Sequence, residues 1–260
     1  MKTLKTTSIV ILIIMINTVA FSKTSLEMGK EWWAKRADGA VGTNAKTGPI
    51  SNAINYFEKA IKNRSVEEEV AIELIRSYYF KATFVPMSKD RRKEIYNKGR
   101  IFGENMIKKY PDSAPLKFWL AAHWGKWAQA YGALAAAKEG VADKIRSLSE
   151  DVIRLDPTYY DGGGYQILGL VHQYTPRIPF LLTWPSNNEA LIYMKRATKI
   201  SPNHIGNNFC LAKLLFKKGQ RVKAIIILEK TVKLKPRQNK LIEDRYSIAQ
   251  AEALLKKIKG

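Results

Sequence analysis

The 260-residue sequence has few residues that could carry reactive or cross-linking chemistry: it contains one cysteine and three histidines. A single cysteine, Cys210, cannot form a disulfide within one chain, so stability has to come from packing. Its apolar setting, FCLAKLLF, favours a buried thiol over a free reactive one. His123, His172 and His204 lack both the i, i+4 spacing of a helical metal site and a second cysteine, so we expect no metal.

The sequence also lacks the common catalytic and phosphate-binding motifs. It has no G-x-S-x-G turn. The stretch DGGGYQILGL, which begins at Asp161, puts three glycines before an apolar run but lacks the lysine and the preceding strand of a phosphate loop. We therefore expect Asp161 to cap a helix whose glycines admit a close neighbour. An enzyme is not expected, and neither is a cofactor.

Long apolar runs are missing except for residues 9–16, which follow Lys2 and Lys5. A basic start, a short apolar run and small residues before Lys23 predict a signal peptide at residues 1–22. The run is far short of the roughly 20 residues that span a bilayer. We expect a periplasmic protein without a lipid anchor, because no cysteine lies near the predicted cleavage site.

Acidic residues are scarce, with 23 against 44 lysines and arginines. Cleavage after the signal peptide would remove two lysines and leave a net charge of about +19. Two interpretations stay open: attraction to an anionic envelope surface or an acidic partner, and lysines that merely solvate helix surfaces. Nucleic acid is not expected, because the lysines are dispersed along the chain.

A repeat with the spacing of the tetratricopeptide motif occupies the region after Pro202. Pro202 and Pro236 are 34 residues apart, which is the period of that motif. Before Pro202, Ala190, Met194 and Ala197 fit the second helix of one repeat. After it, the signature positions of the next repeat are filled by Leu211, Ala212, Gly219, Ala224, Leu228 and Thr231. The pattern predicts an all-α fold of stacked antiparallel helix pairs, an α-α superhelix.

The preceding repeats are enlarged. Ser65, Pro111, Pro157 and Pro202 are separated by 46, 46 and 45 residues, so each unit carries an extra 11 or 12. Prolines interrupt the last of them over residues 174–188. A smaller break is expected at residues 83–90. We predict one helical domain over residues 23–260, closed by a capping helix at residues 241–260.

Two groups of side chains are candidates for binding. Leu120, Trp124, Trp127 and Tyr131 form one helical stripe, which favours a core position and leaves a ligand pocket as the alternative. The proline-rich insertion places a charged group beside apolar ones. The predicted binding residues are Trp124, Trp127, Tyr131, Arg177, Phe180 and Trp184. The alternative is that Phe180 and Trp184 only pin the insertion to the helices.

The order of several segments resembles one known family. WWAKRADGAVG, NAINYFEKAI, FWLAAHWGKWAQAYG, DPTYYDGGGYQILG, NNEALIYMKRATKISPN and IEDRYSIAQAEALLKKI follow one another as in the tetratricopeptide-like periplasmic T component of tripartite ATP-independent periplasmic (TRAP) transporters. The resemblance covers nearly all of residues 23–260. It implies a helical accessory protein that pairs with a periplasmic substrate-binding protein and shelters an apolar small molecule. The chain departs from the lipoprotein form of part of that family.

The expected function is therefore a noncatalytic periplasmic binding protein of a TRAP-type transporter. The alternative is a periplasmic scaffold that mediates protein-protein interactions in envelope assembly. A peripheral contact with an anionic envelope surface and a homo-oligomer are further expectations.

Overall fold

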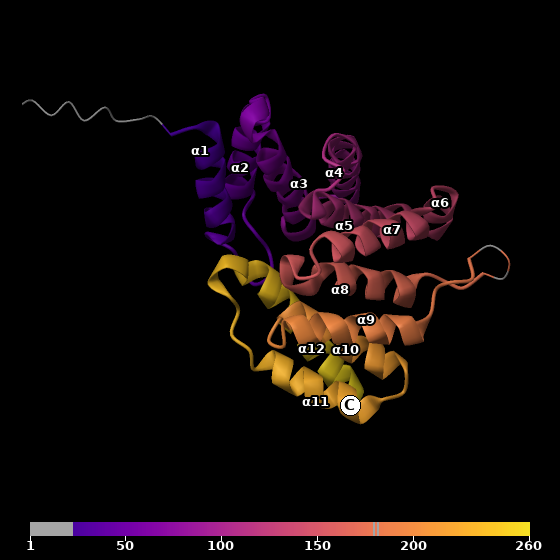
Figure 1. Cartoon of the computed structure of the whole chain (residues 1–260). Helices are drawn as coiled ribbons and strands as arrows, with labels where there is room; N and C mark the ends of the chain where they lie inside the picture. The colour runs from indigo at the N-terminus through magenta and orange to yellow at the C-terminus, as the bar shows by residue number, and fades with distance from the viewer. Residues whose placement is uncertain (1–22, 179, 181) are drawn as a thin grey trace, which may run out of the picture.

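The computed structural model describes residues 23–178, 180 and 182–260, so the predicted signal peptide lies outside the described residues. In this part of the chain helices follow one another without a β-sheet, which confirms the all-α prediction (Figure 1). The α-helices are α1 Ser25–Ala34, α2 Thr47–Ala60, α3 Glu67–Phe84, α4 Lys89–Lys109, α5 Ala114–Tyr131, α6 Ala133–Lys138, α7 Val141–Leu155, α8 Tyr159–Tyr174, α9 Asn187–Ile200, α10 Ile205–Lys217, α11 Arg221–Val232 and α12 Leu241–Lys259. Short 3-10 helices are η1 Lys35–Ala37, η2 Arg64–Val66 and η3 Gln238–Lys240.

The helices stack as successive antiparallel pairs, each packed on the next (Figure 1). The repeat signature explains this close stacking, because its small residues let the helix axes approach. Fully buried signature positions are Ala190, Met194, Ala197, Ala212, Ala224, Leu228 and Thr231. The tetratricopeptide-like pattern read from the sequence is therefore the packing pattern of α9, α10 and α11.

The three enlarged repeats accommodate their extra residues in three different ways. In the first, α3 and α4 lengthen to 18 and 21 residues, and the break expected at residues 83–90 shrinks to residues 85–88. In the second, the short helix α6 is added between α5 and α7. In the third, an irregular link joins α8 to α9 and projects from the array (Figure 1).

The core continues through the array as three adjoining groups of apolar side chains. One group holds α1 to α4, the second is centred on α5, α7 and α8, and the third holds α9 to α12. Each repeat buries its apolar face against its neighbours, as in other stacked arrays. Buried apolar side chains recur along the chain from Ala45 to Ile258.

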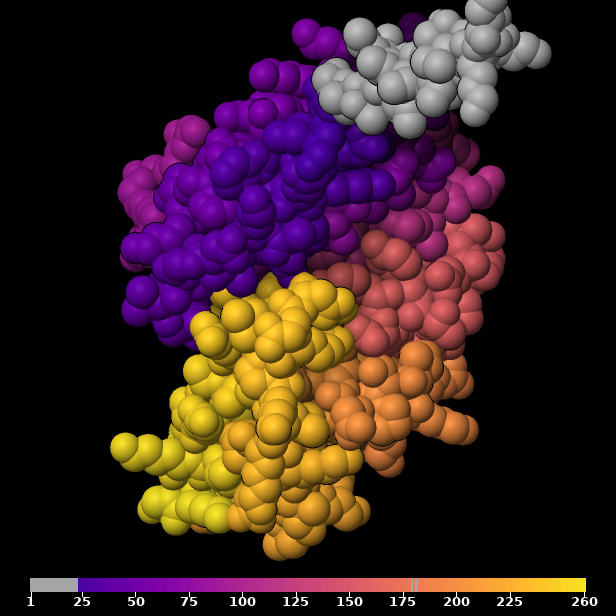
Figure 2. Space-filling model, turned by 90° about the vertical axis from the view of Figure 1, so that its left-hand side faces the viewer, coloured from indigo at the N-terminus to yellow at the C-terminus, as the bar shows by residue number. Residues whose placement is uncertain are grey.

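The start of α12 returns to the beginning of the array. Ile242 is fully buried among side chains of α1 to α4, and the rings of Tyr246 and Phe84 meet edge to face at 5.6 Å. In the view of Figure 2 the gold region around the start of the last helix lies directly against the indigo N-terminal helices. The predicted capping helix thus covers the final repeat and also contacts the N-terminal helices.

Candidate functional site

The irregular link between α8 and α9 is a short hairpin fixed at its base. Ile178 and Leu182 exchange backbone hydrogen bonds of 2.8 Å in both directions. On the returning side, Trp184 Nε1 donates to Asp143 Oδ1 of α7 at 2.8 Å. The Trp184 ring also meets the ring of His172 in α8 edge to face at 4.9 Å. These contacts hold the hairpin on the rigid helices.

Between Ile178 and Leu182, the structure describes an exposed aromatic residue, Phe180. The Phe180 side chain is 103% exposed and its φ of 65° lies in the left-handed region, which is rare for an aromatic residue. Ile178 at the hairpin base and Tyr174 at the end of α8 are also exposed, and Arg177 carries an exposed charge. An exposed aromatic side chain on a supported loop is typical of an interaction site.

The aromatic stripe of α5 lies between α4 and α7. Trp124 is 1% exposed, Trp127 is 8% exposed, and Tyr131 is exposed at the end of the helix. The rings of Trp127 and Tyr131 stack with centroids 4.4 Å apart. Arg100 lies 4.7 Å from the Trp124 ring and Lys144 lies 4.3 Å from it, so cations cover both sides of the stripe.

The six predicted binding residues form two groups linked through α7. Lys144 contacts Trp124 of the stripe, while Arg146, two residues later, lies 5.0 Å from the Trp184 ring of the hairpin. The alternative that Phe180 and Trp184 only pin the insertion to the helices holds for one of the two residues. Trp184 pins the hairpin, whereas Phe180 projects from it. Trp124 and Trp127 are core side chains, and Tyr131, Arg177 and Phe180 are accessible. Ligand binding by these residues stays a prediction.

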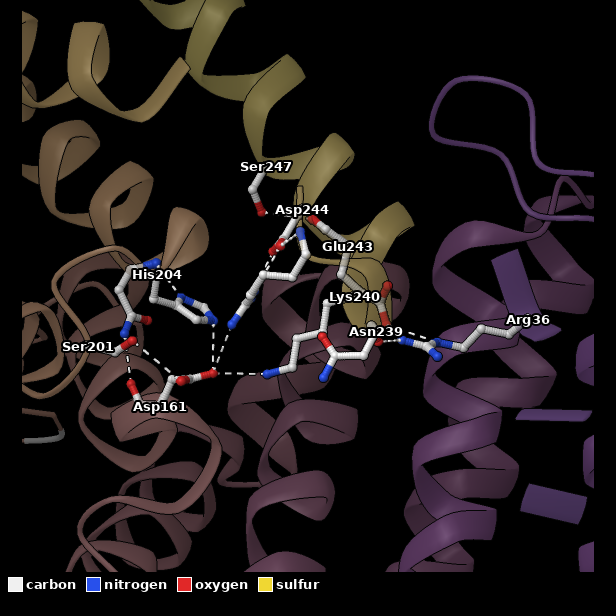
Figure 3. Close-up of polar contacts among 11 residues, drawn as sticks. Arg36, Asp161, Ser201, His204, Asn239, Lys240, Glu243, Asp244 and Ser247 are labelled. Carbon is white, nitrogen blue, oxygen red and sulfur yellow. Dashed lines mark hydrogen bonds and ion pairs between the residues drawn. The ribbon is translucent and has the colours of Figure 1, made fainter. Parts of the chain in front are cut away.

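A polar cluster that the sequence did not reveal joins α8 to the segment before α12 (Figure 3). Asp161 Oδ2 accepts hydrogen bonds from Lys240 Nζ at 2.9 Å and from Arg237 Nη1 at 3.1 Å. His204 Nε2 lies 3.5 Å from the same oxygen. Arg237 also donates three hydrogen bonds to the buried carboxylate of Asp244. We call these five side chains the clasp.

The clasp continues to the first helices. Arg36 donates to Glu243 Oε1 at 2.9 Å and to the carbonyl oxygen of Asn239 (Figure 3). Arg36 is 5% exposed and lies 4.3 Å from the Trp33 ring. A buried arginine that donates hydrogen bonds to a carboxylate and to a backbone carbonyl positions the two elements it joins. It therefore fixes the start of α12 against η1.

The glycine triplet follows a left-handed turn. Tyr160, Asp161 and Gly162 have φ values of 50°, 61° and 78°, and the helix becomes regular after them. Added Cβ atoms at Gly163 and Gly164 would come within 2.4 Å of Phe118 and 2.9 Å of Val152. The predicted close approach of the glycines is thus present. The predicted capping role of Asp161 is wrong, because its carboxylate bonds to Lys240 and Arg237 and makes no helix-capping hydrogen bond.

The electrostatics of Asp161 follow from its partners. Burial alone would raise its pKa, but the hydrogen bond from Lys240 and the charges of Lys240, His204 and Arg237 outweigh burial and hold the pKa below its ordinary value. Burial and the charge of Arg237 lower the pKa of His204 to about 4. At neutral pH the clasp therefore contains an ionised carboxylate and an uncharged imidazole.

The remaining histidines and the cysteine are held by burial or by hydrogen bonds within the helical array. Burial lowers the pKa of His123 to about 4, and its Nε2 lies 3.0 Å from the Ile75 carbonyl oxygen. His172 Nδ1 accepts a hydrogen bond from the Ser186 N–H at 3.2 Å. Burial raises the pKa of the Cys210 thiol to about 11. Over the described ranges, no group of histidine, cysteine, aspartate and glutamate has a metal-binding arrangement.

Two surface hollows lie away from the predicted binding residues. One lies among α9, α10 and α11 and is lined by Leu211, Leu215, Ile226, Ile227 and three polar side chains. The other lies between the starts of α1 and η2. Among the helices of residues 23–178, 180 and 182–260, none is long and apolar enough to cross a membrane.

Comparison with known proteins supports the fold. Among solved structures, the chain is similar to TTC0263, a tetratricopeptide-repeat protein of Thermus thermophilus, with 17% identity and a TM-score of 0.60 over 88% of this chain and 97% of that one. MamA matches with 16% identity and a TM-score of 0.47 over 71% of this chain and 88% of that one. Yeast Tom70 matches with 13% identity and a TM-score of 0.47 over 89% of this chain and 40% of that one. No family model matches the chain, and neither does any curated protein.

The likeness to TTC0263 confirms the tetratricopeptide-like fold. Membership of the T component family stays a prediction.

Proposed function

We propose that this chain is a noncatalytic scaffold that holds another protein, with the hairpin between α8 and α9 as a contact point. The observation that carries the proposal is the complete exposure of Phe180 on a hairpin whose base is fixed by Trp184 and Asp143. An aromatic side chain in a partner pocket is a common source of binding energy. A rigid base lowers the entropy lost when such a contact forms.

The scaffold is also the better supported of the two functions expected from the sequence. Its tetratricopeptide-like fold presents many exposed helix surfaces, and the described polar clusters serve packing and closure. The rings of the aromatic stripe are already contacted by Arg100 and Lys144 and by one another. Support for a protein partner thus comes from accessible residues, while support for an apolar ligand comes from the sequence resemblance.

Photo-crosslinking in the native host tests this proposal. A benzophenone amino acid replaces Phe180 in one strain and Val41, which is 70% exposed and lies between η1 and α2, in a control strain. We expect one discrete crosslinked protein from position 180 and none from position 41. Equal products at both positions, or none at 180, would refute the hairpin as the contact point.

The finer form of the proposal is an exported accessory protein of a TRAP-type transporter, with a substrate-binding protein as the partner. The leader at residues 1–22 and the family resemblance support it. Identification of the crosslinked protein by mass spectrometry tests the partner. Native mass spectrometry of the chain purified from its host tests for a copurified apolar molecule.

A further inference from the structure

The outer surface of the final repeats carries an apolar strip that no described part of the chain covers. Val222 and Ile226, one helical turn apart on α11, are 71% and 61% exposed, and Ile192 on α9 is 45% exposed. Adjacent exposed apolar side chains such as Val222 and Ile226 are typical of an interaction site when they border a hollow.

The strip adjoins the hollow among α9, α10 and α11, the last stacked layers before α12 (Figure 1). Leu211 and Leu215 of α10 form its apolar base, and Ile226 and Ile227 of α11 form a wall. The hollow measures about 270 Å³, which is room for a few apolar side chains and too little for a domain. Its shape suits side chains that project from one face of a helix.

Charge identifies the kind of partner. Lys195 and Lys223 also line the hollow and are exposed, and neither forms an ion pair with a described carboxylate. A second copy of this chain would bring more positive charge, since the net charge is +21. The leader at residues 1–22 is basic as well. A partner with acidic residues complements these lysines, whereas the two basic candidates do not.

We propose that the groove between α9 and α11 binds an amphipathic helix of another protein, with apolar residues in the hollow and acidic residues beside Lys195 and Lys223. The 12 residues of α11 extend over about 18 Å, so a partner helix of about three turns can lie along the groove. The proposal rests on the scaffold function, but it concerns residues separate from the hairpin.

The test uses a fluorescein-labelled, helix-stapled peptide of about 14 residues, with leucines three and four apart and glutamates beside them. Fluorescence anisotropy measures its binding to the protein without the predicted leader. We expect saturable binding that weakens roughly tenfold or more in the Val222→Ser/Ile226→Ser variant. The same loss is expected for Lys195→Glu/Lys223→Glu. These residues are exposed, so circular dichroism should show folded variants.

A matched control separates local from global charge. Lys46→Glu/Lys138→Glu changes the net charge equally at exposed positions outside the groove and should bind the peptide as the unaltered protein does. A peptide with lysines in place of the glutamates should not bind. Phe180→Ser should leave peptide binding intact, so failure of the hairpin proposal and failure of the groove proposal are distinguishable.

Three outcomes would overturn the groove proposal. The first is no binding of the acidic peptide to the unaltered protein. The second is equal weakening by the Lys46/Lys138 and Lys195/Lys223 variants, which would mean nonspecific attraction. The third is binding of phosphatidylglycerol vesicles that Lys195→Glu/Lys223→Glu abolishes while the peptide does not bind, which would assign the surface to an anionic membrane.

Discussion

The replacement Asp161→Asn removes one negative charge from the clasp and keeps the shape of the side chain. Asparagine tolerates the left-handed backbone at least as well as aspartate does, so the φ of 61° adds no separate cost. The amide retains an oxygen acceptor but loses the ionic attraction to Lys240 and Arg237. Any destabilisation therefore reports the charge of Asp161.

The structure sets the expected size of this effect. Hydrogen bonds to charged groups contribute about 1.5–3 kcal/mol each. The Asp161 side chain is 30% exposed, so solvent screening lowers the combined loss to about 1–2 kcal/mol. For a chain of this length, that corresponds to a melting temperature lower by about 2–8 °C.

Urea and thermal unfolding followed by circular dichroism measure the loss. The folded pKa of Asp161 lies below the unfolded value near 3.8, so its stabilisation is complete above that pH and disappears as the pH falls through the folded pKa. The difference between the two proteins should be full at pH 7 and vanish in strong acid. A double-mutant cycle with Lys240→Gln isolates their coupling. Equal stability at pH 7, or zero coupling, would refute the clasp as a stabilising contact.

Two further predictions concern buried groups. Gly99→Ala would put a Cβ 2.0 Å from the His123 ring, so the free energy of unfolding should fall by about 1–3 kcal/mol. In the matched variant Gly125→Ala, the new Cβ lies in mid-helix and meets no atom within 4 Å, so the free energy of unfolding should rise by about 0.5–1 kcal/mol. Equal urea midpoints for the two variants would contradict this. His123 and His204 have folded pKa values of about 4, below the ordinary 6.5, so the unfolded chain binds more protons between these values and stability should fall as the pH drops from 6.5 to 4. His204→Asn should flatten the urea-measured pH profile, and an unchanged slope would count against a buried neutral imidazole.

Repeat periodicity made most of the fold predictable from sequence. The distance from Pro202 to Pro236 and the small residues between them follow from the packing of adjacent helices, which is a local constraint. The structure adopted by the extra residues of the enlarged repeats was harder to predict. One unit lengthens its helices, one adds α6 and one forms the hairpin, and only the third is marked by prolines.

The candidate site was only partly predictable. Pro176 and Pro179 indicated the insertion, and with it the hairpin, because proline interrupts helices. The clasp was missed because Asp161 and Lys240 are 79 residues apart and neither belongs to a motif. The groove was missed for another reason: Val222 and Ile226 have the residue types of core positions, and only the structure shows that none of the described helices covers them.

The contact between Arg36 and Glu243 joins positions 207 residues apart. In an open solenoid each end can unravel alone, because a terminal repeat has only one neighbour. Here the two ends are neighbours of each other, so fraying of either one has to break contacts with the other. The closing contact also spans most of the chain, which makes it slow to form by diffusion and places it late in folding. The array should thus unfold cooperatively, and the start of α12 stabilises η1 and the helices packed beside it.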